Sequence, residues 1–231
     1  VISQAVSGFL CFMYMKKHYP VLKMERSELE WSLRHAGILC KMGVPMGLQY
    51  SITAIGSVVI QTAINSLGSA AVASVTAGQK VSLFFCCPFE ALGGTMATYA
   101  GQNAGAGKIN RIWQGVRSAT ALGAAYAVIA CAVLYFFGDR IPLLFVDAGE
   151  TEVIRQAHQL LIYNSLFYIP LTIVNVWRFT IQGMGFSLLA VAAGVCEMIG
   201  RAFVGFCLVP LTGYIAICFA SPLAWIIADA F

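Results

Sequence analysis

The chain has 231 residues, of which 59% are hydrophobic and only 10% are charged, and its mean hydropathy is +0.80. Soluble domains carry about 25% charged residues because their surfaces face water. This composition therefore excludes an ordinary soluble fold and predicts an all-α bundle of helices that cross a membrane. The net charge of +4 does not indicate a nucleic-acid partner, because the basic residues cluster in connecting segments.

Seven apolar runs follow one another along the chain, and a helix needs about 20 apolar residues to cross a bilayer. The short first run, residues 1–15, fits the end of a preceding span, so we expect the chain to be an internal fragment of a longer membrane protein. A polar and basic connection over 16–41 follows, with a surface helix that starts near Ser27. Residues 42–231 then form a six-helix lobe, with spans expected at about 42–64, 70–100, 113–137, 157–181, 188–209 and 213–231.

Lys and Arg residues gather in alternate connections, which sets the orientation of the spans. Residues 16–41 are rich in them, and the connection over 101–112 with its exit adds Lys108, Arg111 and Arg117. An even number of spans separates these two connections, so both are expected on the cytoplasmic side. We expect a multi-pass protein of the plasma membrane of a bacterium.

The stretch GQNAGAGKINR, residues 101–111, has a Gly-Ala-Gly-Lys core that looks like a phosphate-binding loop. A nucleotide-binding loop needs Gly five residues before the Gly-Lys pair and Ser or Thr directly after it. Gln102 and Ile109 occupy those positions. We therefore interpret the stretch as a turn between two helices, in which Gly105 and Gly107 permit a tight reversal.

Four segments in sequence order resemble the multidrug and toxic compound extrusion (MATE) family. In that family each half opens with a Gly-x-Pro helix and an Asn-x-x-Gly turn, and the next helix ends in Gly-Gln-Asn-x-Gly-Ala-Gly-Lys-x-x-Arg. In this sequence the first pattern appears as GVPMGLQYSITAIGSVVIQTAINSLG. The second pattern appears at the end of the next matching segment, which finishes with AGQNAGAGKINR. The matching segments are residues 43–68, 71–111, 177–201 and 213–229.

The resemblance implies an antiporter of twelve helices in two six-helix lobes, with a central cavity between the lobes. This chain would be the end of helix six and the whole second lobe, and its partner would be the missing N-terminal lobe. Export of organic, often cationic, small molecules would be coupled to a proton or a sodium ion, with membrane lipid around the bundle and no cofactor. Many relatives place an acidic residue in the first helix of this lobe, where the present sequence offers Thr53, flanked by Gln49 and Ser51.

Ionisable residues inside the spans are further candidates for lining the cavity, because a charge in the bilayer costs several kcal/mol unless it is paired or hydrated. We expect Glu90 to face the cavity, about 16 Å from the inner end of its helix, whereas Lys80 could line the cavity or make a structural contact. Glu197 and Arg201 stand four residues apart on one helix face, which favours a structural ion pair. Anchoring at the cytoplasmic interface is favoured for Arg178. The complete set of cavity candidates is Glu90, Lys80, Gln49, Thr53, Arg178, Glu197 and Arg201.

Three prolines are candidate hinges, because the carbonyl that a proline leaves without a donor permits bending during alternating access. A kink with a packing role alone is an equal alternative for each of them. They are Pro45, Pro88 and Pro170.

Two other functions remain open on the sequence alone. A lipid-linked saccharide flippase of the same superfamily would need a cavity rich in Arg and Lys for pyrophosphate. An intramembrane enzyme would need a catalytic set, and His18, His35 and His158 all lie at span edges or in loops. No metal site is expected, because the eight cysteines are scattered through apolar runs, without metal spacing.

We predict that Lys108 and Arg111 act on topology and folding rather than on nucleotide binding. The intact protein should bind no ATP in titration calorimetry. Lys108→Ala/Arg111→Ala should lower the fraction of molecules inserted with this turn inside, because inner positive charges orient the spans. Specific ATP binding that Lys108→Ala abolishes would contradict this prediction.

Overall fold

The computed structural model describes residues 2–19, 32–147 and 149–231, and every regular element in these ranges is a helix. Contacts between residues divide the chain into two units, Val1–Lys41 and Met42–Phe231. The first unit contains α1 (Ile2–His18), which has no buried residue. Helix α2 (Leu33–Asn65) begins in the first unit and continues into the second. Residues 33–41, which were assigned to a connection with a surface helix, therefore form the first turns of α2, and the expected helix start at Ser27 lies outside the described residues.

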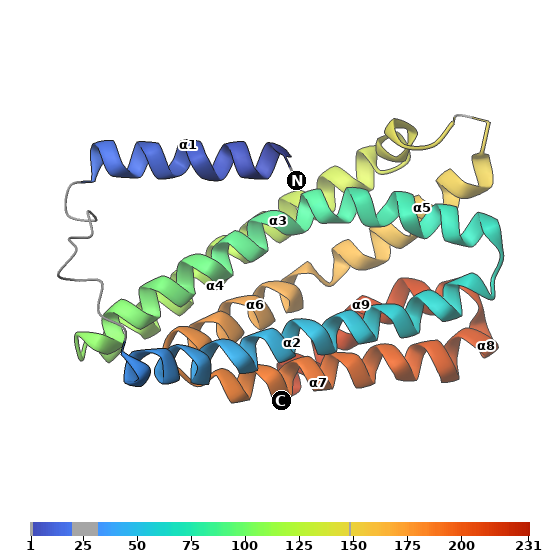
Figure 1. Ribbon diagram of the computed structural model, residues 1–231. Helices are drawn as coiled ribbons and strands as arrows, with labels where there is room; N and C mark the ends of the chain where they lie inside the picture. Colours follow the sequence, from blue (N-terminus) through green and yellow to red (C-terminus); the bar gives the residue numbers. More distant parts are fainter. Residues whose placement is uncertain (1, 20–31, 148) are drawn as a thin grey trace. The chain divides into compact units, whose positions relative to one another are not determined.

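The second unit is an up-and-down bundle whose turns alternate between two ends (Figure 1). The turns before α4 and α7 lie at one end, here called the inner end, and those before α3 and α9 lie at the other, the outer end. Its further elements are α3 (Ser69–Gly105), α4 (Ile109–Phe137), η3 (Ile141–Leu144), α5 (Thr151–Leu166), α6 (Tyr168–Gly183), α7 (Ser187–Phe203), η4 (Val204–Leu208), α8 (Val209–Thr212) and α9 (Tyr214–Ala230).

Four helical segments in the described residues are long and apolar enough to cross a membrane. They are α2, α3, α4 and the continuous stretch Ser187–Thr212, and the bent pair α5–α6 makes a fifth. Helix α9 is apolar but has only 17 residues. The α-helical membrane bundle expected from composition is thus present, with its helices close to the predicted apolar runs.

The predicted span over 157–181 is broken at Phe167, where α5 and α6 meet at an angle of 55°. Pro170 is the third residue of α6. A proline has no N–H to donate to the carbonyl four residues earlier, and its ring clashes with that carbonyl, so the helix bends before Pro170. The expected kink is present, whereas motion at this kink stays a prediction.

The connection over 101–111 is a tight helix-to-helix turn, as expected. Helix α3 ends at Gly105 and α4 begins at Ile109. Gly107 has a φ of +70°, a left-handed conformation that glycine adopts without steric cost. The Lys108 amide donates to the Asn103 carbonyl over 2.8 Å and closes the turn.

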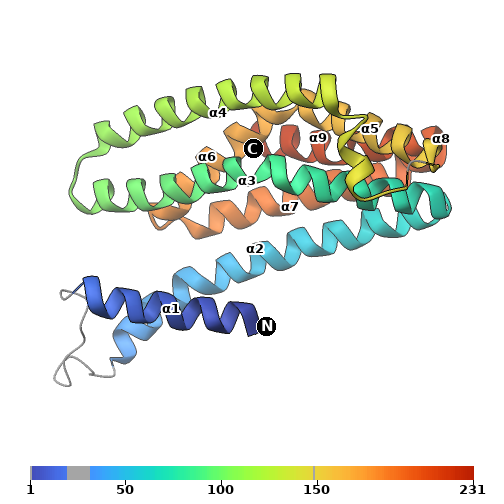
Figure 2. The ribbon, with the colours of Figure 1, turned by 90° about the horizontal axis from the view of Figure 1, so that it is seen from above.

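Helices α3 and α6 approach so closely that their backbones are in contact near the inner end. A Cβ atom placed on Gly183 would lie 2.1 Å from the carbonyl oxygen of Ala97. Farther along the same interface, the buried ring of Phe89 packs against Tyr168, with 5.3 Å between the ring centroids. The two helices therefore form the fixed centre of the bundle, with α4 packed beside both of them (Figure 2).

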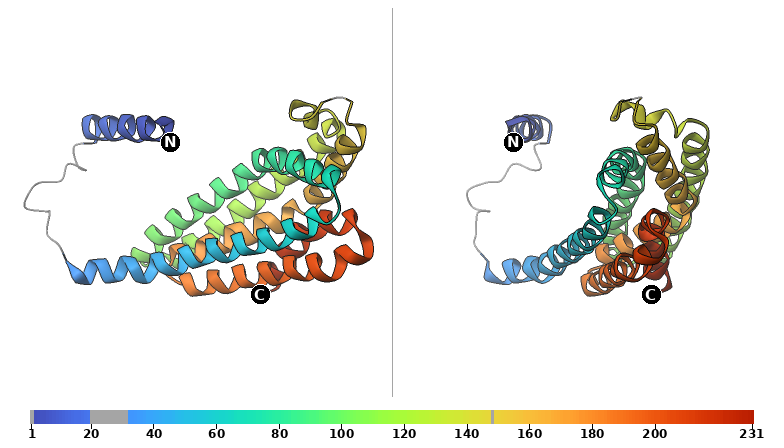
Figure 3. Two further views of the ribbon diagram at one scale, coloured as in Figure 1. Left: turned by 45° about the vertical axis from the view of Figure 1, so that its right-hand side comes forward. Right: turned by 90° about the vertical axis from the view of Figure 1, so that its right-hand side faces the viewer.

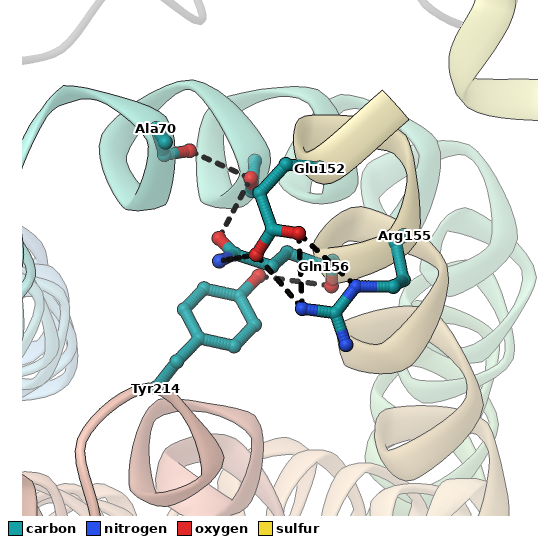
Figure 4. A network of polar contacts seen from close by, with 6 residues as sticks. Ala70, Glu152, Arg155, Gln156 and Tyr214 are labelled. Atoms are coloured by element: carbon teal, nitrogen blue, oxygen red, sulfur yellow. Dashed lines mark hydrogen bonds and ion pairs between the residues drawn. The ribbon is translucent and has the colours of Figure 1, made fainter. Parts of the chain in front are cut away.

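A polar network joins α3, α5 and α9 at the outer end (Figure 4). The Ser74 hydroxyl, which has a single proton to donate, lies 2.6 Å from the Ala70 carbonyl oxygen and 3.0 Å from Oε1 of Gln156. Gln156 in turn donates to Glu152 over 2.7 Å, and the Tyr214 hydroxyl donates to the Gln156 carbonyl over 3.0 Å. This network fastens the outer ends of three helices that are far apart in sequence.

We predict that Gly183→Ala destabilises the protein, because the new methyl group must push α6 away from α3. Overpacking of this kind costs about 1–3 kcal/mol, so thermal unfolding of the purified protein in detergent should shift several degrees lower. Gly94→Ala is the matched control, since a Cβ there meets nothing within 4 Å and Ala favours a helix. Equal unfolding temperatures for the two variants would contradict the close contact.

Candidate functional site

A buried carboxylate on α7 forms the centre of a charge cluster between α6 and α7. Glu197 is only 3% exposed. Its Oε1 accepts a hydrogen bond from Nη2 of Arg178 on α6. Its Oε2 lies 3.6 Å from Nη2 of Arg201, one turn along α7. Two guanidinium groups therefore share one carboxylate, each facing a different oxygen.

The sequence predicted only one of these two ion pairs. The Glu197–Arg201 pair at spacing i, i+4 is confirmed. The anchoring of Arg178 at the membrane interface is wrong, because its side chain is only 10% exposed and pairs with Glu197. Sequence spacing cannot reveal that pair, since it depends on how α6 and α7 are rotated relative to each other.

Two contacts extend this cluster to α2. Gln182 on α6 donates to Oε1 of Gln49, and Nη1 of Arg201 donates to the backbone carbonyl of Thr53 over 3.3 Å. The helices can approach because Gly56 has no side chain, and a Cβ there would lie 3.3 Å from the Met198 Cα. Gln49 and Thr53, predicted as cavity residues, thus lie in a polar seam between α2, α6 and α7. The ribbons of these three helices run beside one another in the left view of Figure 3.

Asp229 on α9 is a carboxylate near this cluster that the sequence reasoning missed. It lines a pocket of about 430 Å³ together with Trp177 and Arg178. The criterion that selected Glu197, an ionisable residue in an apolar run, also applies to Asp229. The cluster therefore has a second acidic neighbour on α9.

Glu90 lies on a face of α3 that the described helices leave open. Exposed residues recur on this face every three or four positions, along most of the length of α3. Glu90 makes no hydrogen bond or ion pair with any other residue that the structure describes, and it sits in the second half of a 37-residue helix. The exposed residues of this face, here called the open face of α3, are Thr76, Lys80, Leu83, Cys87, Glu90, Gly94 and Thr98.

Lys80 lies at the outer end of the open face of α3, where it contacts residues of the outer loop. Its Nζ lies 5.5 Å from the centroid of the Phe145 ring. It also lines a pocket of about 530 Å³ with Asp147 and Glu150. Ten residues of helix separate Lys80 from Glu90, about 15 Å along the axis, so the structure brings Lys80 to the outer loop and not to Glu90.

The proline candidates differ in their surroundings. Pro88 lies inside α3, two residues before Glu90. The Tyr126 hydroxyl donates to the nearby Phe85 carbonyl over 3.1 Å, which supports the backbone where the proline interrupts the helical hydrogen bonds. Pro45 lies inside α2, in a stretch without buried residues before Gln49. Motion at both prolines stays a prediction.

We predict that breaking the buried ion pair impairs folding far more than breaking an exposed one. Glu197→Gln leaves two guanidinium groups uncompensated, and removal of one partner of a buried pair costs about 3–5 kcal/mol. Fluorescence-detected size-exclusion chromatography should show a clear loss of folded protein, and Glu197→Gln/Arg201→Gln should recover part of it.

Arg155→Gln is the control for this prediction, because its pair with Glu152 has side chains 69% and 52% exposed. Exposed pairs contribute only about 0–1 kcal/mol, so the folded yield should stay near that of the wild type. A wild-type yield for Glu197→Gln would contradict the structural role of the buried pair.

Comparison with known proteins places these features in a family context. The MatE family model matches residues 45–207. The probable multidrug resistance protein YoeA of Bacillus subtilis (strain 168) is 23% identical over 188 residues, which are 80% of this chain and 40% of that protein. The probable multidrug resistance protein YpnP of the same organism is 25% identical over 73% of this chain and 37% of its own length. The chain thus spans less than half the length of these relatives.

Solved structures show the same fold at low sequence identity. An outward-facing multidrug resistance MATE family transporter of the MOP superfamily superposes with a TM-score of 0.74 at 14% identity, over 84% of this chain and 43% of that chain. A MOP superfamily transporter from Pyrococcus furiosus, whose binding pocket is described as having reverse polarity, gives a TM-score of 0.70 at 16% identity over 84% and 43%. Because the family model covers well over half of the 231 residues, the chain belongs to the MatE family.

Proposed function

We propose that the chain is the second lobe of an exporter that moves organic compounds, often cationic, across the plasma membrane of a bacterium in exchange for a proton or a sodium ion. Membership of the MatE family and a membrane-spanning helical bundle support a transporter rather than an enzyme. The observation that carries the proposal is the Glu90 carboxylate, which lies inside a span-length helix on the open face of α3. A lone carboxylate at this depth is costly against lipid, so it belongs in a water-filled cavity.

The arrangement of α2 and α3 supports this position for the cavity. Residues 42–65 of α2 and the whole of α3 meet at the outer turn (Figure 1), and the view from above shows them diverging toward the inner end (Figure 2). The helices α4, α5 and α6 pack on the covered face of α3. The open face of α3 is therefore the surface available to a first lobe, with the cavity between the two lobes.

Glu90 needs a cation during transport, because its charge has no partner among the described residues. A proton, a sodium ion or a cationic substrate can neutralise it. Lys80 is about 15 Å away along the helix and lies over Phe145. Exchange of one cation for another at Glu90 gives antiport without any further acidic residue in this lobe.

A lipid-linked saccharide flippase fits the described residues less well. Such a protein needs cationic side chains in its cavity to bind pyrophosphate. Arg178 and Arg201 are instead engaged with Glu197 inside the lobe, and Lys80 lies at the outer end. The open face of α3 presents a carboxylate at the depth where a flippase would need basic residues.

We predict that Glu90→Gln lowers cation-driven transport at least tenfold, whereas Glu90→Asp retains part of the rate with a shifted pH profile. The reason is that only a carboxylate can bind and release the exchanging cation. The measurement is uptake of a fluorescent organic cation into inverted proteoliposomes of the intact protein over a pH series.

Asp139→Asn provides the control, because Asp139 is exposed and lies just beyond the end of α4. Its rate and pH profile should match those of the wild type. If both Glu90 variants also match the wild type, Glu90 is not the exchanging group and the proposal is wrong.

A further inference from the structure

Of the two arginine contacts that join helices in the charge cluster, one is fixed and the other can break. Arg178 and Glu197 join α6 to α7 by a hydrogen-bonded ion pair. Arg201 joins α7 to α2 by one hydrogen bond to the Thr53 carbonyl over 3.3 Å, and it lies 3.6 Å from Glu197. The two arginines therefore have different structural consequences although they share one carboxylate.

We propose that Arg201 is a positioning residue that latches α2 to α7 in one conformation of the transport cycle and releases it in the other, while the Arg178–Glu197 pair stays closed throughout. This inference rests on the proposed exporter function, because it assigns the moving contact for alternating access within this lobe. The family comparison assigns no role to Arg201.

The Arg201 contact can break without leaving the Thr53 carbonyl unsatisfied or the Arg201 charge far from an opposite charge. The Thr53 carbonyl also accepts a hydrogen bond from the Ser57 hydroxyl over 3.1 Å. Arg201 keeps the carboxylate of Glu197 beside it after release. Opening of the Arg178–Glu197 pair would instead leave a carboxylate without its hydrogen-bonded partner in a site that is 3% exposed, which is strongly unfavourable.

Helix α2 is anchored on one side of this contact and free on the other. Toward the outer end, Ile60 and Ile64 are buried in a cluster with Val75 and Ile217. Toward the inner end, Gln49 is the last buried residue, and residues 42–48 have no buried member. A tilt of α2 about the anchored half would thus move the inner half and separate Thr53 from Arg201.

The α2–α7 interface also permits such a tilt. Gly194 faces α2, and a Cβ there would lie 3.2 Å from Cγ of Gln49. On the opposite helix, Gly56 lies against Met198. Small residues let the two helices approach closely between Gln49 and Gly56. Toward the inner end from Gln49 no residue of α2 is buried, so the contacts of Arg201 and Gln49 stand where the packed part of α2 ends.

Arginine suits this latch better than lysine. Its planar guanidinium presents several N–H donors in a fixed fork. Nη1 and Nη2 of Arg201 face the Thr53 carbonyl and the Glu197 carboxylate at the same time. A lysine would keep the charge beside Glu197, but all its donors sit on one nitrogen and cannot face the two acceptors from separate, fixed positions, so Arg201→Lys tests the latch while it preserves the ion pair.

The experiment measures the position of α2 directly, with spin labels on Met46→Cys and Leu188→Cys in the intact protein in lipid. Both sites are exposed at the inner end, on α2 and at the start of α7. All native cysteines of the intact protein, including the eight in this chain, are replaced by Ser or Ala. Loss of a charge-assisted hydrogen bond should raise the ratio of long to short label distances on the order of tenfold in Arg201→Lys. The thermal unfolding temperature should remain near that of the wild type.

Matched variants separate a latch from a merely structural contact. Arg155→Lys, in the outer network, should leave the distance distribution unchanged, and Arg178→Lys should lower the folded yield. Wild-type distances in both Arg201→Lys and Arg201→Gln would overturn the latch. Loss of folding in both Arg201 variants would also overturn it, because the contact would then be structural.

The label distances need no substrate, so the two proposals can fail separately. A distance shift in a protein that transports no organic cation would contradict the exporter and support the latch. Normal transport with unchanged distances in the Arg201 variants would contradict the latch and support the exporter.

Discussion

The structure of this lobe depends on the sharing of one buried carboxylate between two arginines. An ionised carboxylate that is 3% exposed requires compensation, and Arg178 and Arg201 supply it from α6 and α7. This requirement fixes the rotation of α6 relative to α7 and brings Arg201 within reach of the backbone of α2. The cluster therefore serves the architecture, and Glu90, on the open face of α3, is the carboxylate that we propose for exchange.

Close backbone contacts provide the rigid counterpart to this charge cluster. Lipid gives little hydrophobic driving force between helices, so small residues that allow close packing decide which helices associate. Gly183 against Ala97 fixes α6 on α3, and the network around Gln156 fastens the outer ends of α3, α5 and α9. A closely packed centre with α2 attached at its periphery is consistent with the proposed transport cycle, in which α2 tilts against the rest of the lobe.

The sequence predicted the helical membrane class, the approximate spans and the turn at Gly107, because apolar run length and glycine placement are local properties. It also predicted the Glu197–Arg201 pair, which follows from helical spacing alone. It could not predict the partnership of Arg178 with Glu197, which requires the mutual rotation of two helices. The sequence also could not predict the acceptor of the Arg201 hydrogen bond, because that acceptor is a backbone carbonyl. Asp229 could have been found, since an acidic residue in an apolar run was the signal already used for Glu197.

Solvent access to the open face of α3 tests the account most directly. Single cysteines at positions 90 and 94, introduced one at a time into the intact protein after its native cysteines are replaced by Ser or Ala, can be treated with a membrane-impermeant thiol reagent and compared with a cysteine at Leu122. Leu122 is 64% exposed on α4 and faces lipid if the open face of α3 borders the cavity. We predict fast labelling at positions 90 and 94, competed by an organic cation at position 94, where Glu90 is retained, and negligible labelling at position 122. Equally slow labelling at all three positions would show that Glu90 faces lipid or protein, and would contradict the account.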